Sequence, residues 1–196
     1  MSNASNTTAN DILACARTLI IAGGYNGFSY ADIAVAVGIR KASIHHHYPT
    51  KVDLVQKLVR QYREEALAGI VHLEREIPDP LEQLRFYIKY WETCIENATA
   101  PICVCALLAS ELPALPAEIG QEVRAHFQSL SAWLASILER GVQQGRVRLT
   151  GNMRAEAESI MATVHGAMIS ARAYGDPEIF GVVTAPLLER LGSPDA

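Results

Sequence analysis

The chain has 196 residues, 49% of them hydrophobic and 7% aromatic, and its formal net charge is −4 at pH 7. This length suits one compact domain or two closely packed ones, and the apolar fraction is enough to fill a core. No run approaches the roughly 18 consecutive apolar residues of a membrane span, and the polar N-terminus lacks the regions of a signal peptide, so we expect no membrane partner.

The charge is unevenly distributed along the chain. Residues 1–63 hold seven Lys/Arg and three Asp/Glu, a net charge of +4, whereas residues 64–196 carry −8. A basic N-terminal part on an acidic body is the pattern expected when only the N-terminal part meets phosphates. The alternative is a chance asymmetry, and the motif in the same part of the chain decides between the two.

Two helices are predicted first. Apolar residues at helical spacing indicate a helix from about Thr8 to Gly23. A second, short helix follows Ser29, whose side chain can cap it, while Asp32 can reach back to the cap from three residues further on. An apolar stripe along barely two turns gives this helix one face to bury, and it consists of Ile33, Ala34 and Val37.

Gly38 separates the second helix from a third. A sharp turn with a left-handed residue costs least at glycine. The third helix is predicted from about Arg40 to His47, and Pro49 forbids its continuation. Two short helices joined by a turn that contains glycine form a helix-turn-helix, whose second helix lies in the major groove of DNA.

The segment from Asp32 to Leu54 carries many spaced identities to a known pattern: Asp32-Ile33-Ala34, Gly38-Ile39, Lys41-Ala42-Ser43-Ile44, His45-His46-His47-Tyr48-Pro49-Thr50-Lys51 and Leu54. They resemble the DNA-binding signature of the TetR family of transcriptional regulators, over roughly the first third of the chain. His45 stands where the family usually has tyrosine, and Tyr48 stands where it usually has phenylalanine. The resemblance implies a homodimer that binds palindromic, double-stranded operator DNA.

Candidate DNA contacts lie on and beside the third helix, while Ile39 and Ile44 are expected to pack inward. They are Tyr30, Arg40, Lys41, Ala42, Ser43, His45, His46 and Lys51. Arg40 and Lys41 can bind guanine edges or phosphates, and the spacing does not decide which. The resemblance implies that the residues from Lys41 to Ser43 lie in the groove and that the first two histidines meet the phosphate strand. Lys51 begins the next helix, whose free amides also favour a phosphate.

The three consecutive histidines do not predict a metal site. Successive helical residues point ~100° apart, so His45, His46 and His47 cannot converge on one ion. We therefore expect neither a metal nor a cofactor.

Six more helices are predicted after the third, which makes about nine in all. They span approximately Lys51–Glu76, Leu81–Asn97, Ile102–Leu112, Pro116–Gly145, Asn152–Gly175 and Asp176–Leu191. Arg146 to Leu149 is interpreted as a loop, and Pro186 is expected to bend the last helix. The predicted fold is all-α: a three-helix DNA-binding head at residues 8–50, and a helical bundle for ligand binding and dimerisation at residues 51–192.

Small residues recur among large ones in the last two long helices, where they let helices approach closely. They are Ala157, Gly166, Ala167, Ser170, Ala171, Ala173, Gly181 and Ala185. The resemblance implies that this pair of helices forms a four-helix dimer interface with its copy, whereas the alternative is ordinary core packing. A two-fold dimer suits the two half-sites of a palindrome.

Aromatic and sulfur-containing residues of the bundle are candidates for an effector pocket, although each can also be a plain core residue. They are Tyr87, Trp91, Cys103, Cys105, Leu107, Phe127, Trp133, Met161, His165 and Met168. As a set they favour a small hydrophobic or amphipathic ligand.

The four cysteines have no repeating spacing, which suits a reducing cytoplasm better than a disulfide framework. Cys103 and Cys105 are two residues apart on a predicted helix, so they neither pair easily nor share a metal, and one of them is expected to face the interior. By resemblance to family members that sense electrophiles or oxidants, one of them can be a reactive thiol. The alternative is that both are small buried hydrophobes, and the absence of a basic neighbour in the short helix favours it.

The predicted function is that of a TetR-type DNA-binding transcriptional regulator in the cytoplasm. It would act as a repressor that a small effector, or cysteine modification, releases from its operator. An activator or a co-repressor-dependent regulator stays open, because the sequence does not fix the sign of the response. An enzyme is not expected, since the sequence shows no nucleophile–base pair, no paired carboxylates at active-site spacing and no glycine-rich phosphate loop.

Overall fold

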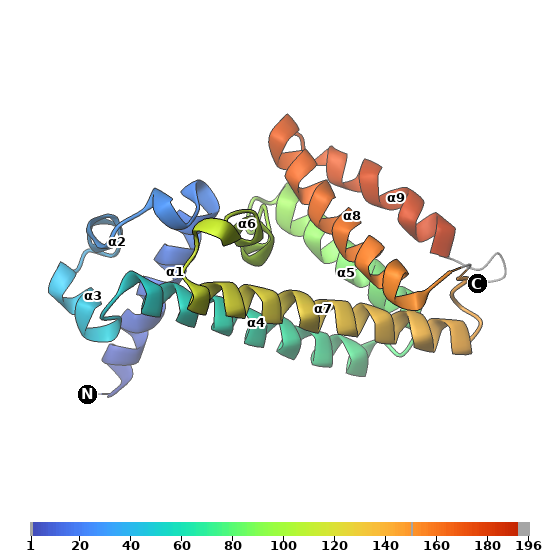
Figure 1. The fold of residues 1–196 in the computed structure, drawn as a ribbon, viewed down its shortest axis with the longest axis horizontal. Helices are drawn as coiled ribbons and strands as arrows, with labels where there is room; N and C mark the ends of the chain where they lie inside the picture. The colour runs from blue at the N-terminus through green and yellow to red at the C-terminus, as the bar shows by residue number, and fades with distance from the viewer. Residues whose placement is uncertain (1, 150, 192–196) are drawn as a thin grey trace. The chain divides into compact units, whose positions relative to one another are not determined.

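A computed structural model describes residues 2–149 and 151–191 of the chain. Within these ranges the chain forms nine α-helices, two short 3₁₀ turns and no β-strand (Figure 1). The elements are α1 (Ser2–Gly23), η1 (Tyr25–Gly27), α2 (Tyr30–Val37), α3 (Lys41–His47), α4 (Lys51–Glu76), α5 (Pro80–Glu96), α6 (Val104–Ser110), η2 (Leu112–Ala114), α7 (Ala117–Gln143), α8 (Met153–Tyr174) and α9 (Glu178–Leu191). The predicted all-α fold class is confirmed.

The chain packs as two compact units. The first unit comprises Met1–Glu65 and Val104–His126, and the second comprises Ala66–Cys103 and Phe127–Ala196. Two of the three divisions of the chain fall within long helices, α4 and α7, and the third lies between Cys103 and Val104, at the start of α6. The predicted domains at residues 8–50 and 51–192 stay a functional prediction, since the first packing unit also includes a segment from the middle of the chain.

In the first unit, α1 packs against α2, α3 and α6. The stripe predicted for α1 is buried, because Ile12, Ala16 and Ile20 are all fully covered. Ile33 of α2 and Ile44 of α3 are covered as well and complete the core of the head. Burying one such isoleucine side chain stabilises the fold by about 1.5–3 kcal/mol, so these residues help to hold the short helices α2 and α3 against α1.

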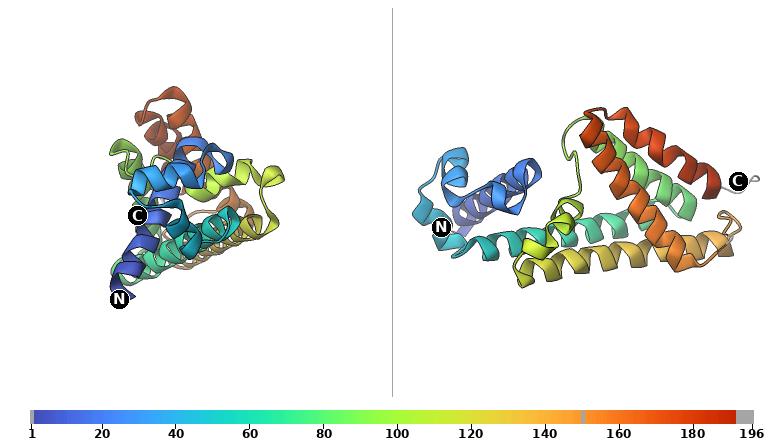
Figure 2. Two further views of the ribbon diagram at one scale, coloured as in Figure 1. Left: turned by 90° about the vertical axis from the view of Figure 1, so that its left-hand side faces the viewer. Right: turned by 45° about the horizontal axis from the view of Figure 1, so that its top comes forward.

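In the second unit, α8 and α9 form an antiparallel helical hairpin, with α5 beside α9 (Figures 1 and 2). Asn152 caps the start of α8 by accepting a hydrogen bond from the Ala155 amide at 3.1 Å. Gly175 ends α8 in the left-handed conformation, with φ 65°. Because α8 stops there, the chain can turn back at once into α9.

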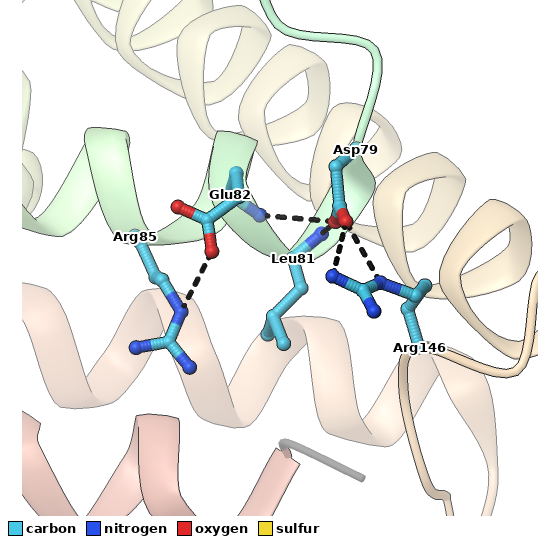
Figure 3. A network of polar contacts seen from close by, with 5 residues as sticks. All are labelled: Asp79, Leu81, Glu82, Arg85 and Arg146. Atoms are coloured by element: carbon cyan, nitrogen blue, oxygen red, sulfur yellow. Dashed lines mark hydrogen bonds and ion pairs between the residues drawn. The ribbon is translucent and has the colours of Figure 1, made fainter. Parts of the chain in front are cut away.

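Asp79 fixes the start of α5 and ties it to the loop that follows α7 (Figure 3). Its carboxylate accepts hydrogen bonds from the amides of Leu81 at 2.8 Å and Glu82 at 3.3 Å, and from Arg146 Nε at 2.7 Å. Burial alone would raise the pKa of Asp79, but these hydrogen bonds and the Arg146 charge outweigh it and lower the pKa below its usual value. Glu82 pairs in turn with Arg85, at 3.2 Å.

One helix prediction differs from the structure. The predicted helix at 102–112 is only Val104–Ser110, because the following residues tighten into the 3₁₀ turn Leu112–Ala114 around Pro113. Pro186 lies inside α9, which continues to Leu191 as predicted, and a bend at Pro186 stays a prediction. Cys103 therefore precedes α6 rather than lying on it, and both Cys103 and Cys105 are buried, at 1% and 0% exposure, where one buried thiol was expected.

Candidate nucleic-acid interface

The start of α2 is fixed by a reciprocal cap. The Ser29 hydroxyl oxygen accepts a hydrogen bond from the Ala31 amide at 3.2 Å, and Asp32 Oδ2 accepts one from the Ser29 amide at 2.7 Å. The bonds from the Ser29 side chain and backbone hold the pKa of Asp32 below its usual value. The predicted capping box is confirmed, and it sets where α2 begins.

The turn between α2 and α3 is the predicted glycine turn. Gly38 has φ 74° and ψ 32°, and its amide donates to the Ala34 carbonyl at 3.0 Å. Ile39 donates to the same carbonyl at 3.1 Å, so this carbonyl near the end of α2 accepts from both residues of the turn. This turn sets the direction in which α3 leaves α2.

One face of α3 is open to solvent. Most of the residues predicted to contact DNA are exposed, namely Arg40, Lys41, Ala42, His45 and His46. Ser43 and Ile39 are half-buried, while Ile44 is fully covered and holds the helix to the core. The structure therefore brings five of the eight candidates onto one accessible helix surface, where groups that read a groove must lie.

Tyr30 is placed differently from those five. It is 7% exposed, and its hydroxyl donates a hydrogen bond to the Tyr48 carbonyl at 2.9 Å. Burial, and to a lesser degree the Asp53 charge, raises the pKa of Tyr30 to about 12, so the hydroxyl stays protonated and remains a donor. Its ring contacts the edge of the His45 ring at 4.8 Å. A direct DNA contact by Tyr30 stays a prediction.

His45 is oriented by a carbonyl as well as by Tyr30. Its Nδ1 lies 3.1 Å from the Pro49 carbonyl oxygen. Because a carbonyl only accepts, Nδ1 carries the proton in this contact, and Nε2 is the ring nitrogen left for another partner. The Nδ1 side of the imidazole is thus held by the Pro49 carbonyl, and the exposed ring leaves Nε2 for a partner outside the chain.

Lys51 lies in the first turn of α4, where Thr50 and Asp53 form another reciprocal cap. Its ammonium group donates to the Phe28 carbonyl and lies over the rings of Phe28 and Tyr25, at 4.0 and 4.8 Å. Burial lowers the pKa of Lys51, against the opposing effects of Asp32 and Glu111. Lys51 thus joins η1, the start of α2 and the start of α4, and its contact with a phosphate stays a prediction.

A cavity of about 380 Å³ opens between these elements. It is lined by Phe28, Ser29, Tyr30, Lys41, His45 and Lys51. Two lysines and an imidazole therefore surround one hollow beside the exposed face of α3. An oxyanion such as a DNA phosphate is the group that this combination of donors fits best.

Sequence reasoning missed Glu111, which follows α6. Its Oε2 accepts a hydrogen bond from the Tyr25 amide at 2.9 Å. The carboxylate lies so close to the turn after α1 that a Cβ added to Gly24 would be 2.0 Å from Glu111 Oε1. Gly24 itself has φ 73°. No local signal could have found this contact, because 86 residues separate Tyr25 from Glu111.

The effector-pocket candidates fall into both units. Cys105 and Leu107 belong to α6 in the first unit, and the others belong to the second. In the second unit the structure brings together two ring pairs: Tyr87 with Trp133, at 5.4 Å between ring centroids, and Phe127 with His165, at 5.1 Å. Trp91, Cys103, Met161 and Met168 are buried. Their role in a pocket stays a prediction.

Part of α8 and α9 is apolar and exposed. Ile169 is 53% exposed, Tyr174 76% and Val182 68%. Of the small residues predicted to lie at an interface, Gly166, Ala173 and Ala185 are exposed, whereas Ala157, Ala167 and Ala171 are buried within the unit. Exposed small and large apolar residues together offer a surface onto which another helix pair can pack closely.

The described residues contain no group of three or more His, Cys, Asp or Glu side chains that could hold a metal ion. None of the helices in the described ranges is long and apolar enough to cross a membrane.

Two family models match the chain. The model described as bacterial regulatory proteins, tetR family, matches residues 12–58, and the model described as tetracyclin repressor-like, C-terminal domain, matches residues 80–185. The first match covers α2, α3 and the start of α4. It therefore contains the exposed helix α3 and the cavity lined by Lys41, His45 and Lys51, which we call the basic cavity.

Solved structures and curated proteins are similar along most of the chain. A transcriptional regulator of the TetR family from Agrobacterium tumefaciens is 66% identical, with a TM-score of 0.94, over 96% of this chain and 100% of that one. A TetR transcriptional regulator from Legionella pneumophila is 28% identical, with a TM-score of 0.82, over 92% and 94% of the two chains. The HTH-type transcriptional repressor KstR2 of Mycobacterium tuberculosis is 24% identical over 143 residues, which are 73% of this chain and 70% of that protein.

Proposed function

Because the chain belongs to the TetR family of bacterial regulatory proteins, we propose that it is a repressor that binds operator DNA through α3 and leaves it when a small molecule binds the second unit. The family consists of DNA-binding transcription regulators. Membership therefore confirms the predictions that this chain is such a regulator and that it is not an enzyme.

The observation that carries the DNA-binding proposal is the basic cavity beside the exposed face of α3. Lys41, His45 and Lys51 line it. In our proposal they hold a phosphate of one strand and thereby set the register of the head on the duplex. Arg40 and Ala42 then face base edges in the major groove, with Ser43 beside them. Tyr30 supports this surface from inside, through its contacts with His45 and Tyr48.

Two copies of the chain are proposed to act together. The exposed apolar residues of α8 and α9, which include Ile169 and Val182, would be covered by the same helices of a second copy. The small exposed residues Gly166, Ala173 and Ala185 support this, because they let helices of the two copies approach closely. An isologous pair places two heads on the two halves of a palindrome, which matches the symmetry of an operator.

Release by a small molecule is proposed over release by cysteine modification. Cys103 and Cys105 are 1% and 0% exposed, and a covered thiol is poorly accessible to an oxidant or electrophile. Repression is proposed over activation because the curated relative KstR2 is named a transcriptional repressor. The chain would act in the cytoplasm, where bacterial operator DNA lies.

A footprint on the DNA upstream of the chain's own coding region tests this proposal. The purified full chain should protect two half-sites related by a two-fold axis, about one helical turn or a multiple of it apart. An unrelated fragment of equal length should show no protected window at the same protein concentration. Equal, unpatterned protection of both fragments would contradict a sequence-specific operator function.

A further inference from the structure

Two buried donors in the second unit lack an acceptor. The hydroxyl oxygen of Tyr87 on α5 and the indole Nε1 of Trp133 on α7 are covered from solvent, and neither group donates a hydrogen bond within residues 2–149 and 151–191. Trp133 is 7% exposed, and the ring of Tyr87 is half-buried although its oxygen is covered. More than about nine-tenths of buried polar groups in folded proteins are hydrogen-bonded, so two orphans in one cluster need an explanation.

The two donors belong to one aromatic contact. The rings of Tyr87 and Trp133 meet edge to face, with centroids 5.4 Å apart and an interplanar angle of 76°. Cys103 lies near enough to the Tyr87 hydroxyl to influence it, as does the Trp91 indole. Burial raises the pKa of Tyr87, Cys103 raises it further, and a hydrogen-bonding approach of the Trp91 indole, which can only donate, lowers it; the hydroxyl stays protonated at neutral pH and its own proton has no acceptor. Both orphan groups are therefore available as donors.

We propose that the Tyr87–Trp133 pair is the polar part of the effector site, and that it binds a small, neutral, aromatic molecule through a hydrogen-bond-accepting oxygen such as a ketone carbonyl. Only the description of this site as an effector site rests on the proposed function, because binding of the ligand itself can be measured without DNA. An aromatic ligand fits because the surrounding rings offer both faces and edges for packing.

The charge of the ligand follows from the side chains that are buried. The buried polar residues among those described are Gln83, Glu122, His126, His165 and Thr184, a set without lysine or arginine. An anionic ligand covered by this unit would therefore find no buried lysine or arginine among the described residues, and covering an unpaired charge is costly. An ammonium group has no lone pair with which to accept from these donors, and indole Nε1–H can only donate. A neutral acceptor remains.

Matched probes test this chemistry. Acetophenone and ethylbenzene have nearly the same shape, but only the ketone has an acceptor oxygen. Calorimetric titration of the full chain should give a dissociation constant for acetophenone about five-fold lower, or more, than for ethylbenzene, because two net hydrogen bonds are formed. Tyr87→Phe and Trp133→Phe should each reduce this preference, whereas Tyr90→Phe, one turn away on the same helix, should retain it. Equal affinity for the two probes, or binding of neither, would overturn the proposal.

Stability gives a second readout that needs no ligand. If the Tyr87 hydroxyl has no partner in the free protein, Tyr87→Phe should leave the melting temperature unchanged or raise it. Tyr30→Phe is the matched contrast, because it removes the bond to the Tyr48 carbonyl and should lower the melting temperature by about 2–4 °C. A similar decrease in Tyr87→Phe would show that the hydroxyl is already satisfied, by an ordered water for example, and would overturn the proposal.

DNA binding by the unmutated chain separates this inference from the proposed function. If the chain binds the upstream fragment specifically but binds acetophenone no more tightly than ethylbenzene, this inference is wrong and the proposed operator function is unaffected. If the chain prefers acetophenone but does not bind the fragment specifically, the inference about the ligand holds and the proposed operator function is contradicted.

Discussion

The Glu111 carboxylate accepts a hydrogen bond from the Tyr25 amide at 2.9 Å, across 86 residues of sequence. This bond attaches the segment after α6 to the turn between α1 and η1. The same carboxylate is one of the two that act on the Lys51 ammonium, which itself lies over the Tyr25 ring. One acidic side chain thus supports the turn on which the basic cavity is built.

Removing this carboxylate should destabilise the first unit. Glu111→Ala leaves the Tyr25 amide without its acceptor, and we expect a loss of about 1–3 kcal/mol in the free energy of unfolding, measured in urea. Glu64→Ala, an exposed position on α4, should change it by less than about 0.5 kcal/mol. Gly24→Ala should also destabilise, since a Cβ there would be 2.0 Å from Glu111 Oε1. The double variant Gly24→Ala/Glu111→Ala should lose less than the sum of the two, and strict additivity would refute the contact.

Acid should weaken the cap of α5. The pKa of Asp79 is lowered in the folded chain, so its contribution to stability is present above its unfolded pKa, near 3.8, and is lost as the pH falls through the lower folded value. Urea midpoints measured from pH 6 down to pH 3 should therefore fall less in Asp79→Asn than in the unmutated chain. A parallel decline in both would show that the ionised carboxylate of Asp79 contributes no acid-sensitive stability.

His45 should be replaceable by the residue usual in the family. In our account its outer ring nitrogen faces a phosphate, so His45→Ala should weaken binding to operator and to unrelated DNA by a similar factor, of about 3–10. His45→Tyr restores a donor and should recover most of the affinity. Fluorescence anisotropy with both fragments measures the two factors. An effect of His45→Ala on the operator alone would assign His45 to base reading instead.

If a second copy of the chain covers the exposed face of α8 and α9, a charge introduced on that face should weaken dimerisation. Val182 is 68% exposed on α9, and Val182→Asp would place a charge in the proposed interface between copies, so the dimer dissociation constant should rise at least about ten-fold. Val71→Asp makes the same change at a 46% exposed position on α4 and should leave the dimer intact. Analytical ultracentrifugation distinguishes these outcomes. Unchanged dimerisation of Val182→Asp would place the interface elsewhere.

Local features of the fold could be predicted from the sequence because their causes are local. The Ser29–Asp32 cap, the left-handed Gly38 and the span Lys51–Glu76 follow from capping residues, glycine and helical periodicity within a few residues of each other. The shortness of α6 was missed, because Leu112 continues the helical spacing of its apolar residues past Ser110, while the backbone tightens around Pro113.

Side-chain direction in the site was harder to predict. The pattern made Tyr30 and Lys51 candidates for DNA contact but did not predict their bonds within the head, because tertiary neighbours decide where such amphipathic side chains turn. Tyr30 bonds to the Tyr48 carbonyl and Lys51 to the Phe28 carbonyl, both distant in the chain. The Glu111–Tyr25 bond and the unpartnered donors of Tyr87 and Trp133 depend on contacts between elements, which leave no periodic trace in a single sequence.

The salt dependence of operator binding in Lys41→Ala tests the central claim most directly. If Lys41 faces a phosphate, the variant should bind more weakly, and the slope of log K against log salt concentration should be less steep by about one unit for each head. Lys89→Ala removes the same charge from α5 and should retain both the affinity and the slope. If Lys41→Ala binds its operator with the unmutated affinity and slope, the exposed face of α3 is not the DNA-binding surface.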